Sequence, residues 1–447
     1  MSRPFYENIV VQNKPTFATF EDHFIHTMKI QLLLPILIFF ITISSAQVEM
    51  ETPAPPYIKT VQFIGDTPLS QLPLIRLGEN LRISFDDIIG DEADYYYTIE
   101  HYNVDWTPSV LAKTEYMNGF DNIRIFEYIN SLATLQIFTH YELNIPNKNT
   151  RALTKSGNYM LKIRNSDKEI VFSRKFMIYD PQVSVGVEIL RTRDLKFVEE
   201  KQVVNFKVDS GEEPLINPKE NVYPLLIQNN NLQQTIGGLA PQYYIGNILQ
   251  YRYDEEASFF AGNEFLAFEN KDVRAATNRV QYIELTELYH NYLYIDPTRA
   301  DKVYTYNPDI NGNFVIRTLQ GNNPDIEAEY AWIHFGVEHE QLPPGQEIYI
   351  HGNFNNYVIE DAVKMNFNAE AGIYELPLLL KQGYYDYNYI VAENGIALPW
   401  NPVSGDFWQT ENEYNVLIYY RRPGGRYDEL IGVGNALSTS IASVRRN

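Results

Sequence analysis

Apolar and aromatic side chains alternate with polar ones over much of the chain after residue 57. Leu81, Ile83 and Phe85, for example, are separated by polar or charged residues, and similar runs recur further along the sequence. A period of two with aromatic and β-branched residues is typical of antiparallel strands that have one buried face. Only residues 284–292 suggest a short helix, and no strand–helix–strand rhythm is present. We therefore predict an all-β chain built of β-sandwiches.

Two proline-containing turns divide the sequence into units of sandwich size. Asp180-Pro181 follows a strand-like run, and Asn323-Pro324 follows a segment rich in Gly and Asn. Such segments commonly connect domains. We expect three sandwiches in series, followed by a frayed tail that lacks a strong pattern. The expected units are residues 57–180, 181–325 and 326–432, with the tail at 433–447.

An uncharged apolar run of 14 residues, Ile30–Ile43, lies near the N-terminus. Lys29 precedes the run and three small residues follow it, which is the arrangement of a cleavable signal peptide. An uncleaved membrane anchor is the alternative, but a spanning helix needs about 20 apolar residues. We therefore expect residues 28–46 to be a signal peptide and residues 1–27 to be a start-site artefact. The exported mature chain would then insert no segment into a membrane.

The composition excludes several classes of function. The chain has no cysteine, which rules out disulfides, thiolate metal sites, cysteine nucleophiles and the lipid-modified cysteine of a lipoprotein. Its formal net charge is −21, from 36 Lys and Arg against 57 Asp and Glu. Nucleic acids and anionic membrane surfaces attract basic proteins, so we expect neither as a partner.

Motifs for catalysis and for cofactor binding are absent from the sequence. There is no G-x-S-x-G elbow, no P-loop and no H-E-x-x-H pair. Residues 309–313 (DINGN) resemble the start of a calcium loop, but Phe314 and Gln320 stand where such a loop needs Gly and Glu. We interpret this segment as a hairpin turn. We expect a protein that is not an enzyme and has no catalytic residues, metal or cofactor.

The C-terminal third carries glycine and aromatic positions of a known kind of sandwich. They are Gly352-Asn353-Phe354-Asn355-Asn356, Gly372-x-Tyr374 and Gly383-x-x-x-Tyr387-x-Tyr389. This set resembles the early-set, immunoglobulin-like sandwich that includes glycogen-binding modules, so we expect tandem sandwiches of this type. Sugar-binding members stack glycan rings on exposed aromatic side chains. The alternative function is therefore an exported glycan-binding protein that uses Tyr357, Tyr374 and Trp400, unless Tyr357 is half-buried.

Several longer segments together suggest a more specific family. They are YYYTIEHYNVDWTPS from Tyr95, YMNGF from Tyr116, SLATLQIFTHY from Ser131, KQGYYDY from Lys381 and YYRRPGGRYDELIG from Tyr419. The pattern resembles the plug proteins of the type IX secretion system, formerly a domain of unknown function in Bacteroidota, over residues 57–433. The resemblance implies a non-enzymatic protein in the periplasm of a Gram-negative bacterium. It also implies a partner, the giant outer-membrane translocon barrel, whose periplasmic mouth the plug closes.

Five residues are candidates for a ligand or partner surface. Trp106 lies in an Asp-Trp-x-Pro turn and is either a core residue or a docking residue at a loop tip. Arg421 and Arg426 belong to the densest basic cluster of an acidic chain, and they either pair between domains or bind a partner. Tyr357 and Trp400 are the candidates for glycan stacking.

Overall fold

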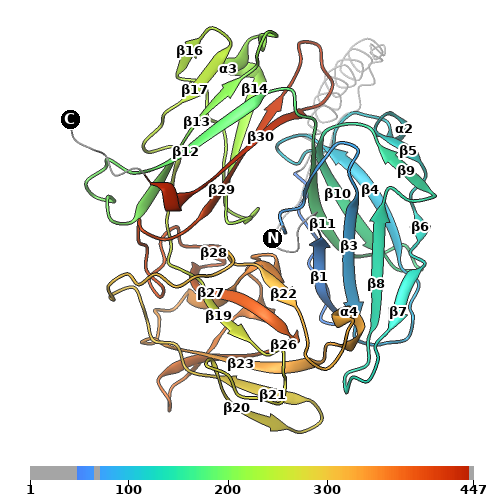
Figure 1. Cartoon of the computed structure of the whole chain (residues 1–447), viewed down its shortest axis with the longest axis vertical. Helices are drawn as coiled ribbons and strands as arrows, with labels where there is room; N and C mark the ends of the chain where they lie inside the picture. The colour runs from blue at the N-terminus through green and yellow to red at the C-terminus, as the bar shows by residue number, and fades with distance from the viewer. Residues whose placement is uncertain (1–47, 65–70, 442–447) are drawn as a thin grey trace, which may run out of the picture. The chain divides into compact units, whose positions relative to one another are not determined.

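The computed structural model describes residues 48–64 and 71–441 of the chain (Figure 1). The expected signal peptide, the residues before it and residues 442–447 of the tail lie outside this part. Within the described ranges, no helix is both long enough and apolar enough to cross a membrane. The regular structure is almost entirely β-strand, as predicted, and the strands form tandem sandwiches.

The first sandwich packs a four-stranded sheet against a five-stranded sheet. One sheet has the order β1 (Ile58–Ile64), β3 (Leu81–Asp87), β8 (Thr139–Ile145) and β7 (Glu127–Asn130). The other has the order β2 (Leu74–Arg76), β11 (Ile170–Tyr179), β10 (Gly157–Arg164), β4 (Tyr96–Tyr102) and β6 (Ile123–Arg124). Helix α2 (Lys113–Tyr116) and the pair β5 (Met117–Gly119) and β9 (Thr150–Leu153) complete it. Both sheets share one core, in which Phe85 stacks on Tyr141 and meets Phe172 edge-on.

The second sandwich combines strands from two distant parts of the chain. One sheet contains β12 (Ser184–Arg191), β13 (Lys201–Asp209), β17 (Ile248–Tyr251), β16 (Tyr243–Ile245) and β18 (Ser258–Phe260). The other has the order β15 (Thr235–Ile236), β14 (Val222–Gln228), β29 (Glu413–Tyr420) and β30 (Glu429–Leu437). Helix α3 (Pro218–Asn221) precedes β14, and the turn η3 (Ser438–Ser440) follows β30. In Figure 1 the red strands β29 and β30 lie with the green strands of this sandwich.

The third sandwich is formed by the chain between β18 and β29. One sheet contains β19 (Leu266–Glu269), β27 (Gly383–Glu393), β22 (Phe314–Ile316), β24 (Gln346–His351) and β28 (Ile396–Ala397). The other has the order β20 (Val280–Leu285), β21 (Tyr289–Leu293), β23 (Tyr330–Glu338), β26 (Ile373–Lys381) and β25 (Asn366–Asn368). Three short helical turns belong to it: α4 (Pro324–Glu327), η1 (Asn353–Asn355) and η2 (Asp361–Val363).

The strand pairing corrects the expected boundaries after residue 181. Strands β19, β21 and β22, which precede residue 325, pair with strands that follow it, so no domain changes there. Asn323-Pro324 is instead the start of α4, where the Asn323 side chain accepts a hydrogen bond from the N–H of Asp325. A helix start and a domain boundary use the same residue types, which explains the error. The expected tail is also partly ordered, because β30 runs to Leu437, and residues 284–292 lie in the β20–β21 hairpin rather than in a helix.

Strand β27 shows how far the alternation predicts burial. Tyr385, Tyr387 and Tyr389 lie in the core of the third sandwich, as expected for one buried face. Alternation alone would leave Asp386 and Asn388 in solvent, but both are buried. The segment 309–313 covers Asp386, whose carboxylate accepts hydrogen bonds from the N–H groups of that segment. Both faces of this strand are therefore covered.

Candidate docking surface

Trp106 lies where the first sandwich meets the second. It has a left-handed backbone conformation, with φ of 61°, and its carbonyl accepts a hydrogen bond from the N–H of Glu49 at 2.9 Å. Its partly buried ring packs against an apolar cluster whose members come from β11, β14, β29 and β30. The ammonium group of Lys175 lies 4.5 Å from the centre of the ring. Trp106 therefore takes part in the contact between two sandwiches.

Arg421 and Arg426 hold the β29–β30 hairpin against the first sandwich. The Arg421 guanidinium donates to both carboxylate oxygens of Asp428, at 2.8 and 3.0 Å, and to the side-chain oxygen of Asn103 at 3.2 Å. Arg426 donates to Glu115 at 2.7 Å and to the Val110 carbonyl at 2.9 Å. Of the two roles considered for this basic cluster, the geometry favours pairing between domains.

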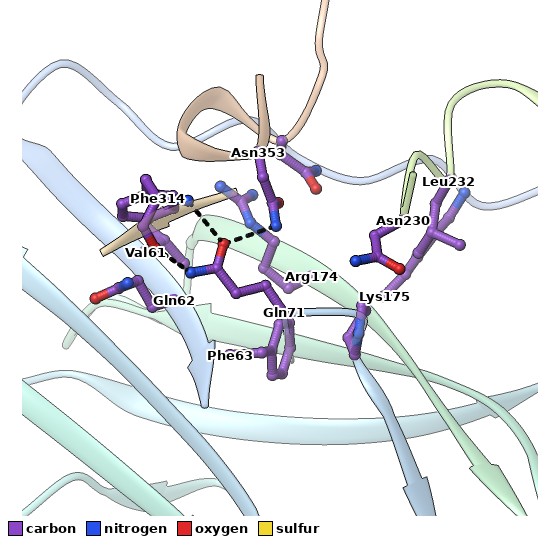
Figure 2. Close-up of a pocket in the computed structure, with 12 residues that line it drawn as sticks. Val61, Gln62, Phe63, Gln71, Arg174, Lys175, Asn230, Leu232, Phe314 and Asn353 are labelled. Atoms are coloured by element: carbon purple, nitrogen blue, oxygen red, sulfur yellow. Dashed lines mark hydrogen bonds between the residues drawn. The ribbon is translucent and has the colours of Figure 1, made fainter. Parts of the chain in front are cut away.

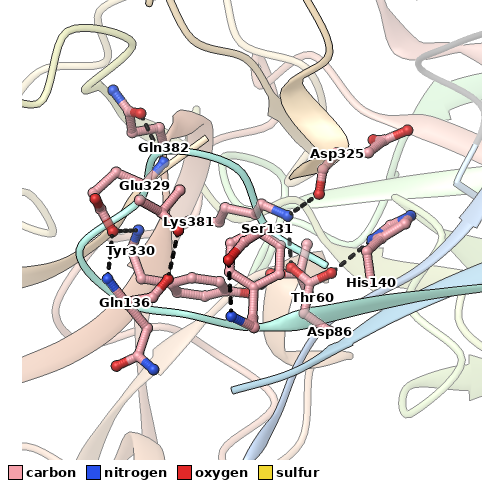
Figure 3. Close-up of polar contacts among 12 residues, drawn as sticks. Thr60, Asp86, Ser131, Gln136, His140, Asp325, Glu329, Tyr330, Lys381 and Gln382 are labelled. Atoms are coloured by element: carbon pink, nitrogen blue, oxygen red, sulfur yellow. Dashed lines mark hydrogen bonds and ion pairs between the residues drawn. The ribbon is translucent and has the colours of Figure 1, made fainter. Parts of the chain in front are cut away.

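A buried ion pair joins the first sandwich to the third (Figure 3). Lys381 at the end of β26 lies 2.6 Å from the carboxylate of Asp86 on β3, and both side chains are almost wholly buried. The same carboxylate accepts a hydrogen bond from the Tyr330 hydroxyl at 2.7 Å and lies 2.6 Å from the imidazole Nδ1 of His140. Burial acts to raise the pKa of Asp86, but the charges of Lys381 and His140 outweigh it and lower this pKa. The carboxylate is therefore held in its charged form.

Residues 131–138 extend the same contact. The N–H groups of Leu135 and Gln136 donate to the two carboxylate oxygens of Glu329, at 2.5 and 3.1 Å. The ring of Phe138 lies 4.0 Å from the Lys381 ammonium group and meets Tyr330 edge-on. Together with Asp86, these groups form a dense polar and aromatic contact in which each buried charge has a partner.

Tyr357 is enclosed between the second and third sandwiches. It is 3% exposed, and its hydroxyl donates a hydrogen bond to the Asn229 carbonyl at 3.0 Å. Its ring meets His351 edge-on at 4.9 Å between ring centres. A sugar ring needs an open aromatic face, so Tyr357 offers no platform. Tyr374 is also buried, whereas Trp400 is 49% exposed. The three aromatic residues considered for glycan stacking therefore form no common surface.

Two partly or fully buried carboxylates organise the 309–313 segment. Asp386 accepts hydrogen bonds from the N–H groups of Ile310 and Gly312, and Asp309 accepts from those of Phe265 and Asn311. Burial raises the pKa of Asp386 to about 7, and burial together with Asp386 raises that of Asp309 to about 8. Both oxygens of Asp309 and Oδ2 of Asp386 thus fix the chain through backbone hydrogen bonds. Among residues 48–64 and 71–441, no three His, Cys, Asp or Glu side chains are grouped to hold a metal ion.

The first sandwich exposes several large apolar side chains between residues 126 and 137, and we call this set the 126–137 patch. Its members are more than half exposed: Phe126, Ile129, Leu132, Leu135 and Ile137. Ile137 lies against the loop at Gly90, next to the exposed Ile89. Large apolar side chains exposed in this way are candidates for an interaction site. The patch includes β7, an edge strand of its sheet, which pairs only with β8.

No sequence pattern marked these residues as exposed. The segment from Ser131 was noted for its resemblance to a family, but its apolar residues fit a buried strand equally well. Which of them are buried depends on the third sandwich, which covers Phe138 and leaves Leu132 and Leu135 in solvent. The five candidates chosen from the sequence lie elsewhere, and four of them contact neighbouring sandwiches.

Comparison with known proteins bears on the same sandwich. Residues 58–180 match the family model described as type 9 secretion system plug protein 1st domain. Over 88% of its length the chain is similar to a hypothetical protein from Parabacteroides merdae, of known crystal structure, with 32% identity and a TM-score of 0.83; the match covers 100% of that protein. No curated protein matches the chain.

A second solved structure is much less similar. Trypsin-activated alpha-2-macroglobulin from Escherichia coli matches with 8% identity and a TM-score of 0.17, over 88% of this chain and 24% of that protein. This score is too low to support an inference.

The fold and the surface define an all-β, multi-sandwich protein whose first sandwich exposes apolar side chains between residues 126 and 137. The chain belongs to the family of type IX secretion system plug proteins, as its sequence segments predicted. Membership ties the chain to type IX secretion and to the cell envelope.

Proposed function

We propose that this protein is a periplasmic, non-enzymatic plug that binds the type IX secretion translocon and closes the periplasmic side of its outer-membrane barrel. The observation that carries the proposal is that the family-matched first sandwich also bears the 126–137 patch. An apolar patch of this kind on an exported protein is costly to leave in water, and a partner that covers it would recover that cost.

The arrangement of the patch suits a large partner surface. Among the described strands, β7 has a neighbour on one side only, so one edge of it is unpaired; Phe126 precedes this strand and Ile129 lies in it. A strand or rim of the barrel could pair with this edge while its apolar side chains cover the patch. The contacts through Asp86 and Arg421 join the sandwiches, so that docking one of them would place all three across an opening.

An affinity pull-down tests binding. A tagged mature chain is used to capture partners from detergent-solubilised envelopes, and the captured proteins are identified by mass spectrometry. We expect a stoichiometric giant outer-membrane barrel with the native chain, and at least a tenfold loss with the double variant Ile129→Asp and Leu132→Asp. The matched control is Val303→Asp and Ile396→Asp, which places the same charges at exposed positions of the third sandwich.

Conductance of the isolated barrel in a planar bilayer tests closure. The native chain, added on the periplasmic side, should lower the conductance, and the patch variant should not. If the barrel is expressed but not captured, or if its conductance is unchanged by the native chain, the proposal is wrong. The glycan alternative is not carried forward, because Tyr357 and Tyr374 are buried.

A further inference from the structure

A cavity lies between the first sandwich and the third, beside the Asp86 contact. We call it the junction cavity. Its volume is about 260 Å³, and its walls come from residues 53–56 and β1 on one side and from residues 354–363 and β26 on the other. Most of the lining is apolar, including Ile58, Val363, Leu378 and Leu380. Pockets for drug-sized ligands are larger, roughly 300–1,000 Å³, so this cavity suits a smaller group such as one amino-acid residue.

Two cations reach this apolar space. Arg174 of β11 and Lys59 of β1 both line the cavity, together with one carboxylate, Glu360. Among the described residues, neither cation has a carboxylate within ion-pair distance. Within residues 48–64 and 71–441, the hydrogen bond that the Arg174 side chain donates goes to the carbonyl of Ser173, at 3.0 Å. A guanidinium has five N–H donors, so this part of the chain leaves most of those of Arg174 to an anion.

Two carboxylates, Glu51 and Glu360, offset part of this charge. Glu51 is near Arg174, but its two oxygens already accept hydrogen bonds from the N–H of Lys175 at 2.6 Å and from the side chain of Asn356 at 2.8 Å. Burial lowers the pKa of both Lys59 and Arg174, and nearby carboxylates only partly offset this. The lining of the cavity itself therefore holds two partly buried cations and one carboxylate, while Glu51 lies outside the lining.

Arg174 also lies at the meeting point of all three sandwiches (Figure 2). A small second space lies on its other side, lined by Phe63 of the first sandwich, Asn230 of the second and Asn353 of the third. Gln71 bridges two of the sandwiches there, because its side chain donates to the Phe314 carbonyl and accepts from the Asn353 amide at 2.9 Å. A ligand held by Arg174 would thus lie at the junction of the three sandwiches.

We propose that the junction cavity binds a carboxylate that carries a small apolar group. The carboxylate pairs with Arg174 and Lys59, and the apolar group occupies the space between Ile58, Val363 and Leu380. Planar carboxylates suit a guanidinium, which can donate two parallel hydrogen bonds to them. Two sources share this chemistry: the C-terminal residue of a peptide chain and a free short-chain fatty acid. The proposal is independent of translocon binding.

Calorimetric titration of the mature chain tests the site with two acid and neutral pairs. The probes are N-acetylleucine against N-acetylleucine amide, and hexanoate against 1-hexanol. We expect each bound acid to exceed its neutral counterpart in affinity by at least tenfold, because the neutral probes cannot pair with Arg174. Binding of N-acetylleucine alone assigns the site to peptide C-termini, and binding of hexanoate alone assigns it to fatty acids.

Three variants connect the binding to this cavity. Arg174→Gln should lower the affinity for the acid probe at least tenfold. The control is Arg317→Gln, which should leave the affinity unchanged, because Arg317 is a surface arginine of the third sandwich that pairs with Glu269. Ala362→Trp blocks the cavity from an exposed position and should also abolish binding while the melting temperature stays that of the native chain. The proposal is overturned if neither acid binds, if the neutral probes bind equally well, or if Ala362→Trp binds as the native chain does.

Discussion

The buried carboxylates of Asp86 and Asp386 are equally hidden from solvent, but only Asp86 has cations beside it. Asp86 meets Lys381 and His140 across the contact between the first and third sandwiches, and its pKa is lowered. Asp386 meets backbone N–H groups, neutral side chains and the neighbouring carboxyl of Asp309 within the third sandwich, and burial raises its pKa to about 7. The contact between sandwiches thus depends on charge, whereas the 309–313 segment is most stable when its carboxylates carry a proton.

The largest expected effect comes from removing the lysine that pairs with Asp86. Lys381→Met leaves the Asp86 carboxylate buried beside Tyr330 and His140 alone, and should lower the free energy of unfolding by about 3–5 kcal/mol. Guanidinium unfolding followed by tryptophan fluorescence measures this. Lys364→Met is the matched control, because Lys364 pairs with Glu347 and Asp361 at the surface and its loss should leave stability unchanged.

The double variant Asp86→Asn and Lys381→Met separates charge burial from packing. If the single variant is unstable because a buried charge has lost its partner, then removing that charge should recover more than half of the loss. A double variant as unstable as Lys381→Met would show that packing of the lysine chain, and not the ion pair, holds the two sandwiches together.

The next largest effect is the dependence of stability on pH that Asp386 and Asp309 cause. The folded chain holds protons on Asp386 and Asp309 at pH values where the unfolded chain, with carboxyl pKa values of about 4, has lost them. Stability should therefore fall as the pH rises from about 5 to 8. Asp386→Asn keeps an acceptor without the charge, so it should raise stability at pH 8 by about 1–3 kcal/mol and flatten this dependence.

Asp86 should give the opposite sign in the same pH series. Its pKa is lower in the folded chain than in the unfolded one, so the stability that it contributes is present above about pH 4 and is lost as the pH falls further. Melting curves of Asp386→Asn and Asp86→Asn between pH 3 and 9 compare the two regions directly. Parallel pH profiles for the two variants would contradict the assignment of charged and protonated forms.

A smaller effect is expected where the ion pair is partly open to solvent. The Arg421–Asp428 pair is neither fully buried nor fully exposed, because the Arg421 side chain is 41% exposed while that of Asp428 is 3% exposed. Arg421→Gln should cost about 1 kcal/mol, since water can replace part of the lost contact. Chemical unfolding measures this loss of stability. A loss as large as that of Lys381→Met would show that solvent exposure does not predict how much each ion pair stabilises the fold.

The smallest effect is expected at Arg426. Its contact with Glu115 lies in solvent, with side-chain exposures of 55% and 37%. Arg426→Gln should leave the melting temperature unchanged within error. A clear destabilisation, measured by scanning calorimetry, would mean that the β29–β30 hairpin depends on this pair.

The fold class and the family were predictable from the sequence, but most of the candidate surface was not. The alternation around Tyr385 and Tyr387 correctly predicted strands with a buried aromatic face, because strand geometry is set by neighbouring residues. Trp106, Tyr357 and Arg421 were noticed for their residue types, yet each contacts a sandwich other than its own. The 126–137 patch was missed, because its residues would suit a core equally well.

The sequence by itself determined what most short segments become, namely strands and turns, and it excluded cysteine chemistry. Only the tertiary structure decided which strands share a sheet, placing β29 beside β14 and the whole third sandwich between β18 and β29. It likewise paired Asp86 with Lys381 and left Asp386 without a cation. The physical reason is one of range. Backbone geometry and side-chain alternation act over a few residues, whereas burial and the pairing of charges depend on segments that meet only after the chain has folded.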